Sequence, residues 1–593
     1  MCGIAGYIGN GGHGLPIVKM MNGAQYHRGP DGGNLFATEC GRVCLGMTRL
    51  SIVDEKTGQQ PMTIDGGDFT IVFNGEIFNA PILRTKLVQD FREVFDTSHS
   101  DTEVIVRLFK HYGTDCFSML NGMFALAIYS RESQTVTLAR DTFGIKPLLY
   151  SHNQHGLIFG SELRSLLLCE GVDKTINSVA LSQYLDCGFV NAPLTIYSGV
   201  CRLQPGQFAE LNIQTGKLNL ITWKEQIRPN QSFLTRGLNA LHEQICSELK
   251  SALERWLISD VPVCYSLSGG LDSSALVGIG SSAGTLNTYS VGYRDKALEM
   301  WDEVHISSEI SKEVSSIHEE IIIDLGSIED DLYELAEIFA EPYGGGLPSY
   351  YLFRAARNNG HRVMITGVGG DELFGNYSNA VTLKQASPRL ASFDAATYIH
   401  TMYGGGAKSS NVPKLKSEFL SSISWNIDAK LNEMIRNSSS LEEAVHIFDE
   451  NTQLPNEFLT MLDLLSMNFS VEARTPFLDK NFSDLMRSIP FELRCTPKDY
   501  KSLLVNSVGG FMPNSALGHA KSGFSLPLSV LMRKTMRGLF DKLMSRRSLE
   551  SAGFYDSKIY PDLIEPFLRG DNRFVALVWR VFFLQFWLSQ TAR

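Results

Sequence analysis

Residues 261–274, VPVCYSLSGGLDSS, determine the architecture of the second half of the chain. The first seven residues have the apolar, β-rich character of a strand, and the Ser-Gly-Gly turn after them opens a helix. Backbone amides at such a turn can surround a phosphate, because glycine has no Cβ to block the approach. Further strand candidates, LNTYSVGY and HRVMITGVGG, alternate with helices. This alternation predicts a parallel α/β sheet.

The glycine turn lacks the Gly-Lys-Ser/Thr of a Walker A loop, which grips the γ-phosphate for transfer. A loop that holds the β- and γ-phosphates as one unit suits cleavage between the α- and β-phosphates. We therefore expect AMP and pyrophosphate as products. A Gly-Ser turn without function is the alternative at this point.

The first two hundred residues read mainly as strands, including DFTIVFNGEIFN, TVTLARDTFG and the doubly buried run MFALAIYS. Residues 190–230 are rich in Pro and Gly, which predicts a connecting segment. Residues 236–257 have the apolar stripe of a packed helix. The late run FVALVWRVFFLQFWLSQ is interrupted by Arg580 and too short to span a membrane, so we expect a buried helix.

Composition limits the class of protein. A chain of 593 residues is expected to form two or more domains, and its net charge of −11 argues against nucleic acid as a partner. The ten cysteines form no CxxC pair with metal-ligand spacing, which favours reduced thiols. No secretory signal or membrane span is recognisable, so we expect a cytoplasmic protein.

Cys2 is a candidate nucleophile. Removal of Met1 would make Cys2 the first residue, and its α-amino group, with a pKa of about 8, could take the thiol proton. Most cysteines at this position have no such role. The blocks that follow are therefore decisive: YHRGPDGG, TRLSIVD, FNGEIFN, SDTEVIVRLF and NGMFALAIY.

In this order, these blocks resemble the class II glutamine amidotransferase domain, an N-terminal-nucleophile fold of two antiparallel sheets flanked by helices. We place it at residues 2–210. The resemblance implies that Cys2 attacks the glutamine amide to form a thioester, and that Asn74 and the backbone of Gly75 form the oxyanion hole. The residues implied to bind glutamine are Arg49, Asn74, Glu76 and Asp101.

The second half contains GVGGDELFGNY, SMNFSVEARTPFLD and HAKSGFSLPL after the glycine turn. Together these resemble the synthetase half of glutamine-hydrolysing asparagine synthetases, a parallel ATP pyrophosphatase-type domain that we place at residues 230–593. Asp272 and Asp371 would hold Mg²⁺, and Lys521 would steady the departing pyrophosphate. The residues implied to bind ATP are Leu267, Ser268, Gly269, Gly270, Asp272, Ser273, Ser274, Val291 and Gly367.

Both resemblances imply a ligase that uses glutamine, ATP and a carboxylate acceptor, with a shielded passage for ammonia between the two sites. A homodimer is a candidate assembly. The acceptor is open, because Val368 stands where asparagine synthetases usually have an acidic residue. Glu341 and Tyr343 are candidate acceptor contacts, and the Gly triplet after Tyr343 is expected to widen the pocket.

Three alternatives remain. The acceptor could be a sugar uronate, a peptide or a natural-product intermediate instead of aspartate. An intramolecular cyclase of the β-lactam synthetase type would not need ammonia, but such enzymes tend to lose the nucleophilic cysteine that this chain keeps. A non-catalytic binding or sensor protein would not need Cys2, Asp272, Asp371 and Lys521 together.

Overall fold

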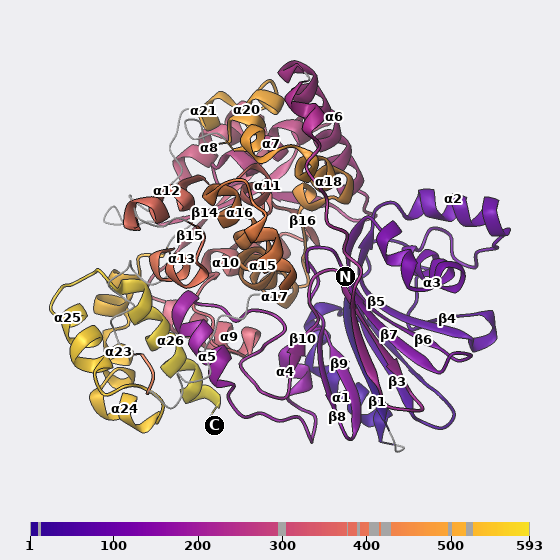
Figure 1. Cartoon of the computed structure of the whole chain (residues 1–593), viewed down its shortest axis with the longest axis horizontal. Helices are drawn as coiled ribbons and strands as arrows, with labels where there is room; N and C mark the ends of the chain where they lie inside the picture. The colour runs from indigo at the N-terminus through magenta and orange to yellow at the C-terminus, as the bar shows by residue number, and fades with distance from the viewer. Residues whose placement is uncertain are drawn as a thin grey trace.

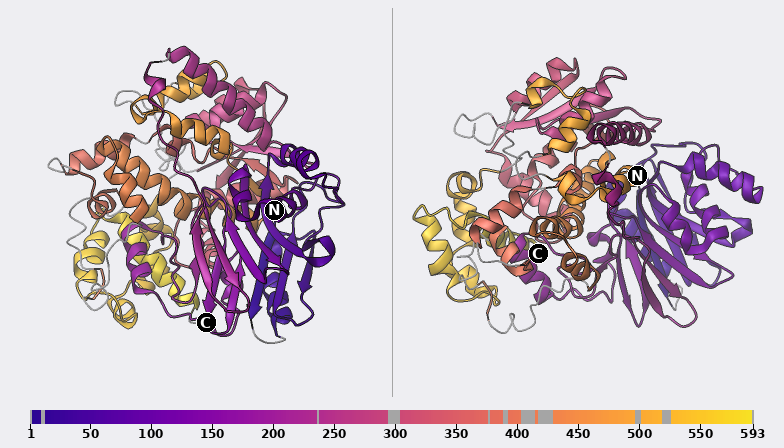
Figure 2. Two further views of the ribbon diagram at one scale, coloured as in Figure 1. Left: turned by 45° about the vertical axis from the view of Figure 1, so that its right-hand side comes forward. Right: turned by 45° about the horizontal axis from the view of Figure 1, so that its top comes forward.

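Two halves of the chain lie side by side in the computed structural model (Figure 1). The structure describes all residues except 1, 10–12, 236, 294–303, 376, 388–391, 403–413, 417–428, 496–500, 518–525 and 592–593. The turned views of Figure 2 show the same division, with the indigo and purple sheets on one side and the later helices on the other.

The first half is a sandwich of two antiparallel sheets. One sheet has the order β10 (Cys201–Arg202), β8 (Leu149–Asn153), β9 (Gly156–Gly160), β1 (Cys2–Gly9), β3 (Val43–Arg49) and β2 (Gly32–Ala37). The other has the order β12 (Leu218–Thr222), β11 (Gln207–Asn212), β7 (Thr135–Arg140), β6 (Gly122–Ser130), β5 (Phe69–Ile77) and β4 (Met62–Ile64). Helix α1 (Gly14–Ala24) packs on the first sheet, and α3 (Asp101–Tyr112) packs on the second.

The predicted strand MFALAIYS is confirmed as β6, which is buried along nearly its whole length because both of its faces are covered. The predicted connector is only partly a connector. Strands β11 and β12 lie within residues 190–230 and extend the second sheet to Thr222. Turn residues between short strands concealed these elements in the sequence.

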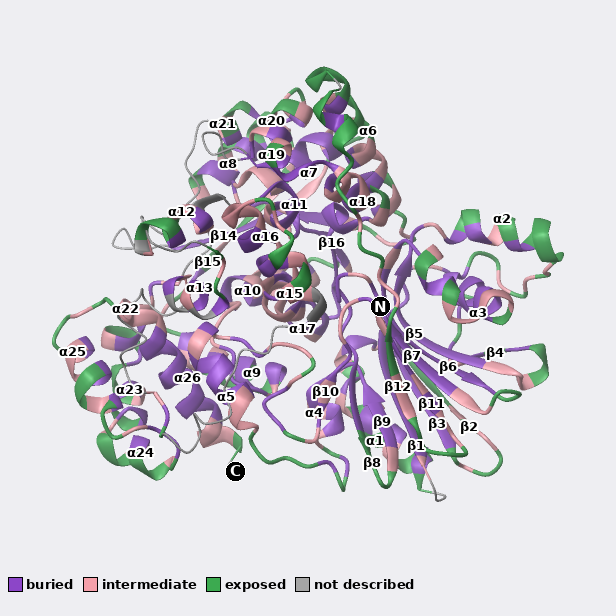
Figure 3. Cartoon of the chain, in the orientation of Figure 1, coloured by how far each residue is buried: buried purple, intermediate pink, exposed green. Residues whose placement is uncertain are grey.

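The second half is built on a parallel sheet, as predicted. Its order is β15 (Ile317–Ile323), β14 (Asn287–Tyr293), β13 (Val263–Ser266), β16 (Val363–Ile365) and β17 (Glu472–Arg474). The helices that pack around this sheet are α6 (Leu238–Trp256), α7 (Leu271–Ser281), α8 (Val304–Glu313) and α10 (Leu347–Asn358). Figure 3 shows β14 and β16 buried and the outer helices exposed on one side, whereas the edge strand β15 is mostly exposed.

The expected C-terminal helix is α26 (Val575–Thr591), and it is buried over most of its length. Helix α5 (Ser178–Cys187) packs against it, although α5 comes from the first part of the sequence. Arg580 Nη1 donates to the carbonyl oxygens of Leu185 at 3.2 Å and Asp186 at 2.6 Å, at the C-terminal end of α5. No helix among the described residues is long and apolar enough to cross a membrane.

Gly278 tests how closely α7 is packed. A Cβ at this position would lie 2.1 Å from the Phe511 carbonyl oxygen, so Gly278→Ala should destabilise the protein by about 1–3 kcal/mol. At Gly538, in helix α23 (Arg537–Leu543), a Cβ would have no neighbouring atom within 4 Å. Gly538→Ala should therefore be neutral or slightly stabilising. Thermal unfolding of both variants checks this, and equal midpoints would contradict the packing.

Candidate active sites

Cys2 begins β1, and hydrogen bonds with two other residues fix both its backbone nitrogen and its carbonyl oxygen. Its nitrogen donates to Asn74 Oδ1 at 3.1 Å, and its carbonyl oxygen accepts a hydrogen bond from Arg28 Nε at 3.1 Å. Cys2 lies opposite Arg49 in the β1–β3 register. Burial raises the pKa of the Cys2 thiol, so the thiol rests in its neutral form and needs a base.

Asn74 and Gly75 lie on β5, which faces Cys2 across the sandwich. Asn74 Nδ2 is buried and donates to no other group of the described protein. A buried donor without an acceptor is costly, so it is well suited to an oxygen that arrives with a substrate. At Gly75 a Cβ would lie 2.0 Å from the Met123 carbonyl oxygen, which restricts this position to glycine.

Glu76 and Asp101 form an acidic pair near Cys2. Asp101 begins α3, and its Oδ2 accepts a hydrogen bond from the Ile77 nitrogen at 3.0 Å. Burial raises the pKa of Asp101 to about 6, and burial together with the Asp101 charge raises the pKa of Glu76 well above its usual value. Two buried carboxylates repel each other, so a bound ammonium group would stabilise their ionised forms.

Arg49 is buried at the end of β3. Its Nη1 donates to the Glu55 carbonyl oxygen at 2.8 Å and its Nη2 to the Asp54 carbonyl oxygen at 2.6 Å. These carbonyls orient the guanidinium without neutralising its charge. The first site therefore brings a thiol, an amide donor without a protein acceptor, a cation and an acidic pair close together.

The glycine turn joins β13 to α7. Gly269 has a φ of 80°, a conformation that favours glycine. The Ser268 nitrogen donates to Ser273 Oγ at 3.2 Å, and Ser274 Oγ donates to the Gly270 carbonyl oxygen at 2.8 Å. These bonds close the turn over the first turn of α7, where amides favour an anion.

The remaining predicted nucleotide contacts border this turn. The Leu267 nitrogen donates to the Tyr289 carbonyl oxygen at 2.8 Å, which ties the end of β13 to β14. Val291 is buried on β14. A Cβ at Gly367 would lie 3.0 Å from the Ser273 nitrogen, so the chain after β16 passes close to α7. Lys521 lies outside the described residues.

Lys501 joins the two predicted metal ligands, and no sequence motif singles it out. Its buried Nζ pairs with Asp371 at 2.9 Å and also with Asp272. The two carboxylates therefore converge on one point, and hard oxygen donors suit Mg²⁺. Among the described residues no group of three or more His, Cys, Asp or Glu forms a metal site. Mg²⁺ that arrives with ATP needs only one or two protein carboxylates.

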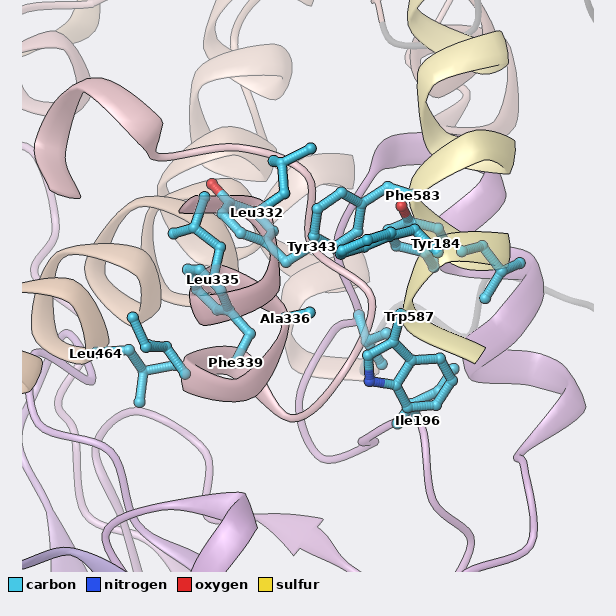
Figure 4. Close-up of a cluster of buried hydrophobic side chains, with 14 of the residues drawn as sticks. Tyr184, Ile196, Leu332, Leu335, Ala336, Phe339, Tyr343, Leu464, Phe583 and Trp587 are labelled. Carbon is cyan, nitrogen blue, oxygen red and sulfur yellow. The ribbon is translucent and has the colours of Figure 1, made fainter. Parts of the chain in front are cut away.

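The acceptor candidates differ in their surroundings. Val368 is half-buried among apolar side chains. Glu341 is buried and forms an ion pair with Arg202 of β10. Tyr343 lies in an apolar cluster, with its ring centroid 4.5 Å from that of Phe339 (Figure 4).

The Gly triplet serves close packing, which corrects the expectation that it widens the pocket. A Cβ at Gly344 would lie 2.4 Å from Trp579 Nε1 of α26. Gly346 has a φ of 82°, and a Cβ there would lie 2.6 Å from the Leu465 side chain. Larger residues at Gly344 or Gly346 would push the loop away from α26 and from the helix that contains Leu465.

A shared apolar cluster contains residues from both halves of the chain. Leu50 and Phe78, which follow Arg49 and Glu76 along the chain, belong to the same buried cluster as Leu478 of the second half, and Val368 packs against it. The ring centroids of Phe78 in the first half and Trp256 in the second half lie 4.3 Å apart. Close packing of these apolar side chains excludes water from this part of the contact between the halves.

Comparison with known proteins agrees with this geometry. Residues 1–223 match the family model described as a glutamine amidotransferase domain, and residues 244–589 match the one described as asparagine synthase. The chain is 29% identical to asparagine synthetase [glutamine-hydrolyzing] 1 of Bacillus subtilis, across 97% of this chain and 93% of that protein. It is 27% identical to asparagine synthetase [glutamine-hydrolyzing] 3 of the same organism, across 88% and 87%.

A further relative is a fungal protein. The chain is 24% identical to amidase chry2 of Gibberella zeae, and the match covers 95% of each protein. The asparagine synthase match alone spans more than half of the chain, and it includes the glycine turn, Asp371 and Lys501. The chain belongs to the asparagine synthase family.

Proposed function

We propose that this protein makes asparagine from aspartate, with glutamine as the nitrogen donor and ATP cleaved to AMP and pyrophosphate. The observation that supports the proposal most is the Cys2 site, where the free Asn74 donor, Arg49 and the acidic pair surround one thiol. A thiol alone has many uses, but this set fits an amino acid with a side-chain amide. A cytoplasmic location and a homodimer remain part of the proposal.

In the first reaction, Arg49 would bind the α-carboxylate of glutamine, and Glu76 with Asp101 its α-ammonium. Once Met1 has been removed, the α-amino group of Cys2 takes the thiol proton, and the thiolate attacks the amide carbon. Asn74 Nδ2 and the Gly75 N–H donate to the oxyanion. The ammonium form of the Cys2 amine then protonates the leaving nitrogen. Ammonia departs, and water later hydrolyses the thioester to glutamate.

In the second reaction, an oxygen of the acceptor carboxylate attacks the α-phosphorus of ATP and pyrophosphate leaves. Ammonia attacks the resulting acyl-adenylate, and AMP is released with the amide. Asp272 and Asp371 would hold Mg²⁺, which offsets the phosphate charge when bound. The turn at Ser268–Gly270 would bind the phosphates through its amides, and Lys501 lies close enough to add a positive charge.

Aspartate is the acceptor we favour, because two relatives that match nearly the whole chain bear the name asparagine synthetase. Val368 does not fit aspartate as the acceptor, because asparagine synthetases usually have an acidic residue at this position. Its apolar side chain can neither accept a proton nor bind an ammonium group, so the acceptor has to be tested directly.

Cys2→Ala should separate the two reactions. The variant loses the nucleophile, so AMP formation with glutamine and aspartate should fall below detection, while AMP formation with added ammonium should stay within about twofold of the wild type. Pyrophosphate release with a panel of carboxylates, aspartate included, identifies the acceptor. Loss of both activities, or release of ADP instead of AMP, would contradict the proposal.

Glutamine use should also depend on pH through the acidic pair. The pKa of Asp101 is raised to about 6, so below that pH the pair takes up a proton and loses its attraction for the α-ammonium. We expect kcat/KM for glutamine to fall as pH decreases through about 6. AMP formation with added ammonium provides the control, because it should lack this decrease. An acid limb near the ordinary aspartate pKa of about 4 would contradict this assignment.

A further inference from the structure

Arg28 connects Cys2 to both halves of the molecule. It ends the short turn Tyr26–Arg28 and is wholly buried. Each of its three nitrogens donates to a different group: Nε to the Cys2 carbonyl oxygen at 3.1 Å, Nη1 to Glu162 Oε1 at 3.0 Å, and Nη2 to Asp463 Oδ2 at 2.8 Å. The first two partners belong to the sandwich, whereas Asp463 lies on α17 (Leu459–Asn468) of the second half.

The carboxylates around Arg28 hold it in place. The side chains of Glu162 and Asp463 are also almost completely buried, and Lys146 Nζ lies 3.3 Å from Asp463 Oδ1. Breaking a buried pair leaves an uncompensated charge in the interior, which is strongly unfavourable. If Asp463 moves, Arg28 must therefore follow or leave a buried charge unpaired.

Asp463 is also connected to the proposed ATP site. Soon after α17 the chain enters β17, and Ser470 Oγ between them donates to the His27 carbonyl oxygen at 2.6 Å. Strand β17 pairs with β16, with Ala473 opposite Met364. The residues that follow β16 lead to Asp371 in α11 (Gly370–Phe374). Chain connections and one strand pairing thus link Asp371 to α17, and Arg28 links α17 to the carbonyl oxygen of Cys2.

We propose that Arg28 is a positioning residue that couples the synthetase half to the Cys2 nucleophile. Asn74 fixes the nitrogen of Cys2 and Arg28 fixes its carbonyl oxygen, so a shift of Arg28 turns the thiol relative to the oxyanion hole. Misplacement by about 1 Å can cost about a hundredfold in rate. Binding of ATP at the glycine turn and near Asp371, together with the acceptor, would then raise glutamine hydrolysis. This inference rests on the proposed function.

Asp463→Asn in the full chain tests the coupling, because it keeps the shape of the side chain and removes its charge. In the wild type, ATP, Mg²⁺ and aspartate should raise kcat for glutamate release several-fold. In the variant this stimulation should drop below about twofold, with KM for glutamine and ammonium-dependent AMP formation unchanged. Unchanged stimulation would overturn the inference, and so would an equal loss of ammonium-dependent synthesis.

Asp260→Asn is the matched control. Asp260 Oδ2 also links the halves, accepting from the Asp54 nitrogen at 3.0 Å and pairing with His99 at 3.3 Å, but it is exposed and does not contact Arg28. This variant should keep the stimulation. Loss of stimulation in Asp260→Asn as well would show that any interface change has the effect, and would overturn the specific role of Arg28.

Arg28→Lys provides a second variant if Asp463→Asn does not fold. Lysine keeps the positive charge but lacks the planar fork that reaches three acceptors. It should lose the stimulation too, and retention would overturn the inference. Where both variants fold, the double variant should lose less than the product of the single effects.

Measurements on the wild type distinguish a failure of the coupling from a failure of the proposed function. Glutamate release that does not respond to ATP and aspartate would overturn the coupling but leave the proposed function intact. A wild type that releases no glutamate from glutamine would overturn the proposed function itself.

Discussion

Transfer of ammonia from the first proposed reaction to the second depends on a dry interface between the two halves of the chain. An acyl-adenylate is hydrolysed if water reaches it, and ammonia in water is mostly present as ammonium, which cannot attack. The interface combines an apolar cluster, in which the ring centroids of Phe78 and Trp256 lie 4.3 Å apart, with buried hydrogen bonds such as that from Asn121 Nδ2 to Asp479 Oδ2 at 3.0 Å. The apolar surface favours neutral ammonia over ammonium, and the hydrogen bonds fix how the halves meet.

Local patterns were sufficient to predict the main elements. The alternation of strands and helices around the glycine turn indicated the parallel sheet, and the long apolar run indicated α26. Short strands between turn residues were less visible, so β11 and β12 were mistaken for a connector. The packing of α5 on α26 depends on contacts between residues nearly four hundred positions apart, such as Tyr184 and Arg580, which no local pattern reveals.

The same distinction applies to the sites. Motif blocks predict roles for Cys2, Asn74 and the acidic pair, and the β1–β3 register explains why Arg49 lies beside Cys2. Lys501 lies in no motif, and Arg28 lies in the block YHRGPDGG, which does not reveal its role. Their partners Asp272 and Asp463 are 229 and 435 positions away, so no local pattern shows these contacts. Conversely, Glu341 has the chemistry of a substrate contact, but the fold engages it in an ion pair with Arg202.

The most direct test of a shared, protected interface follows the nitrogen atom. The protein would be given glutamine labelled with ¹⁵N at the amide, ATP, Mg²⁺ and aspartate, together with a larger pool of unlabelled ammonium. Mass spectrometry of the asparagine then reports where its amide nitrogen came from. The account predicts that most of the asparagine carries ¹⁵N from the start of the reaction. Label diluted to the composition of the bulk ammonium would contradict it.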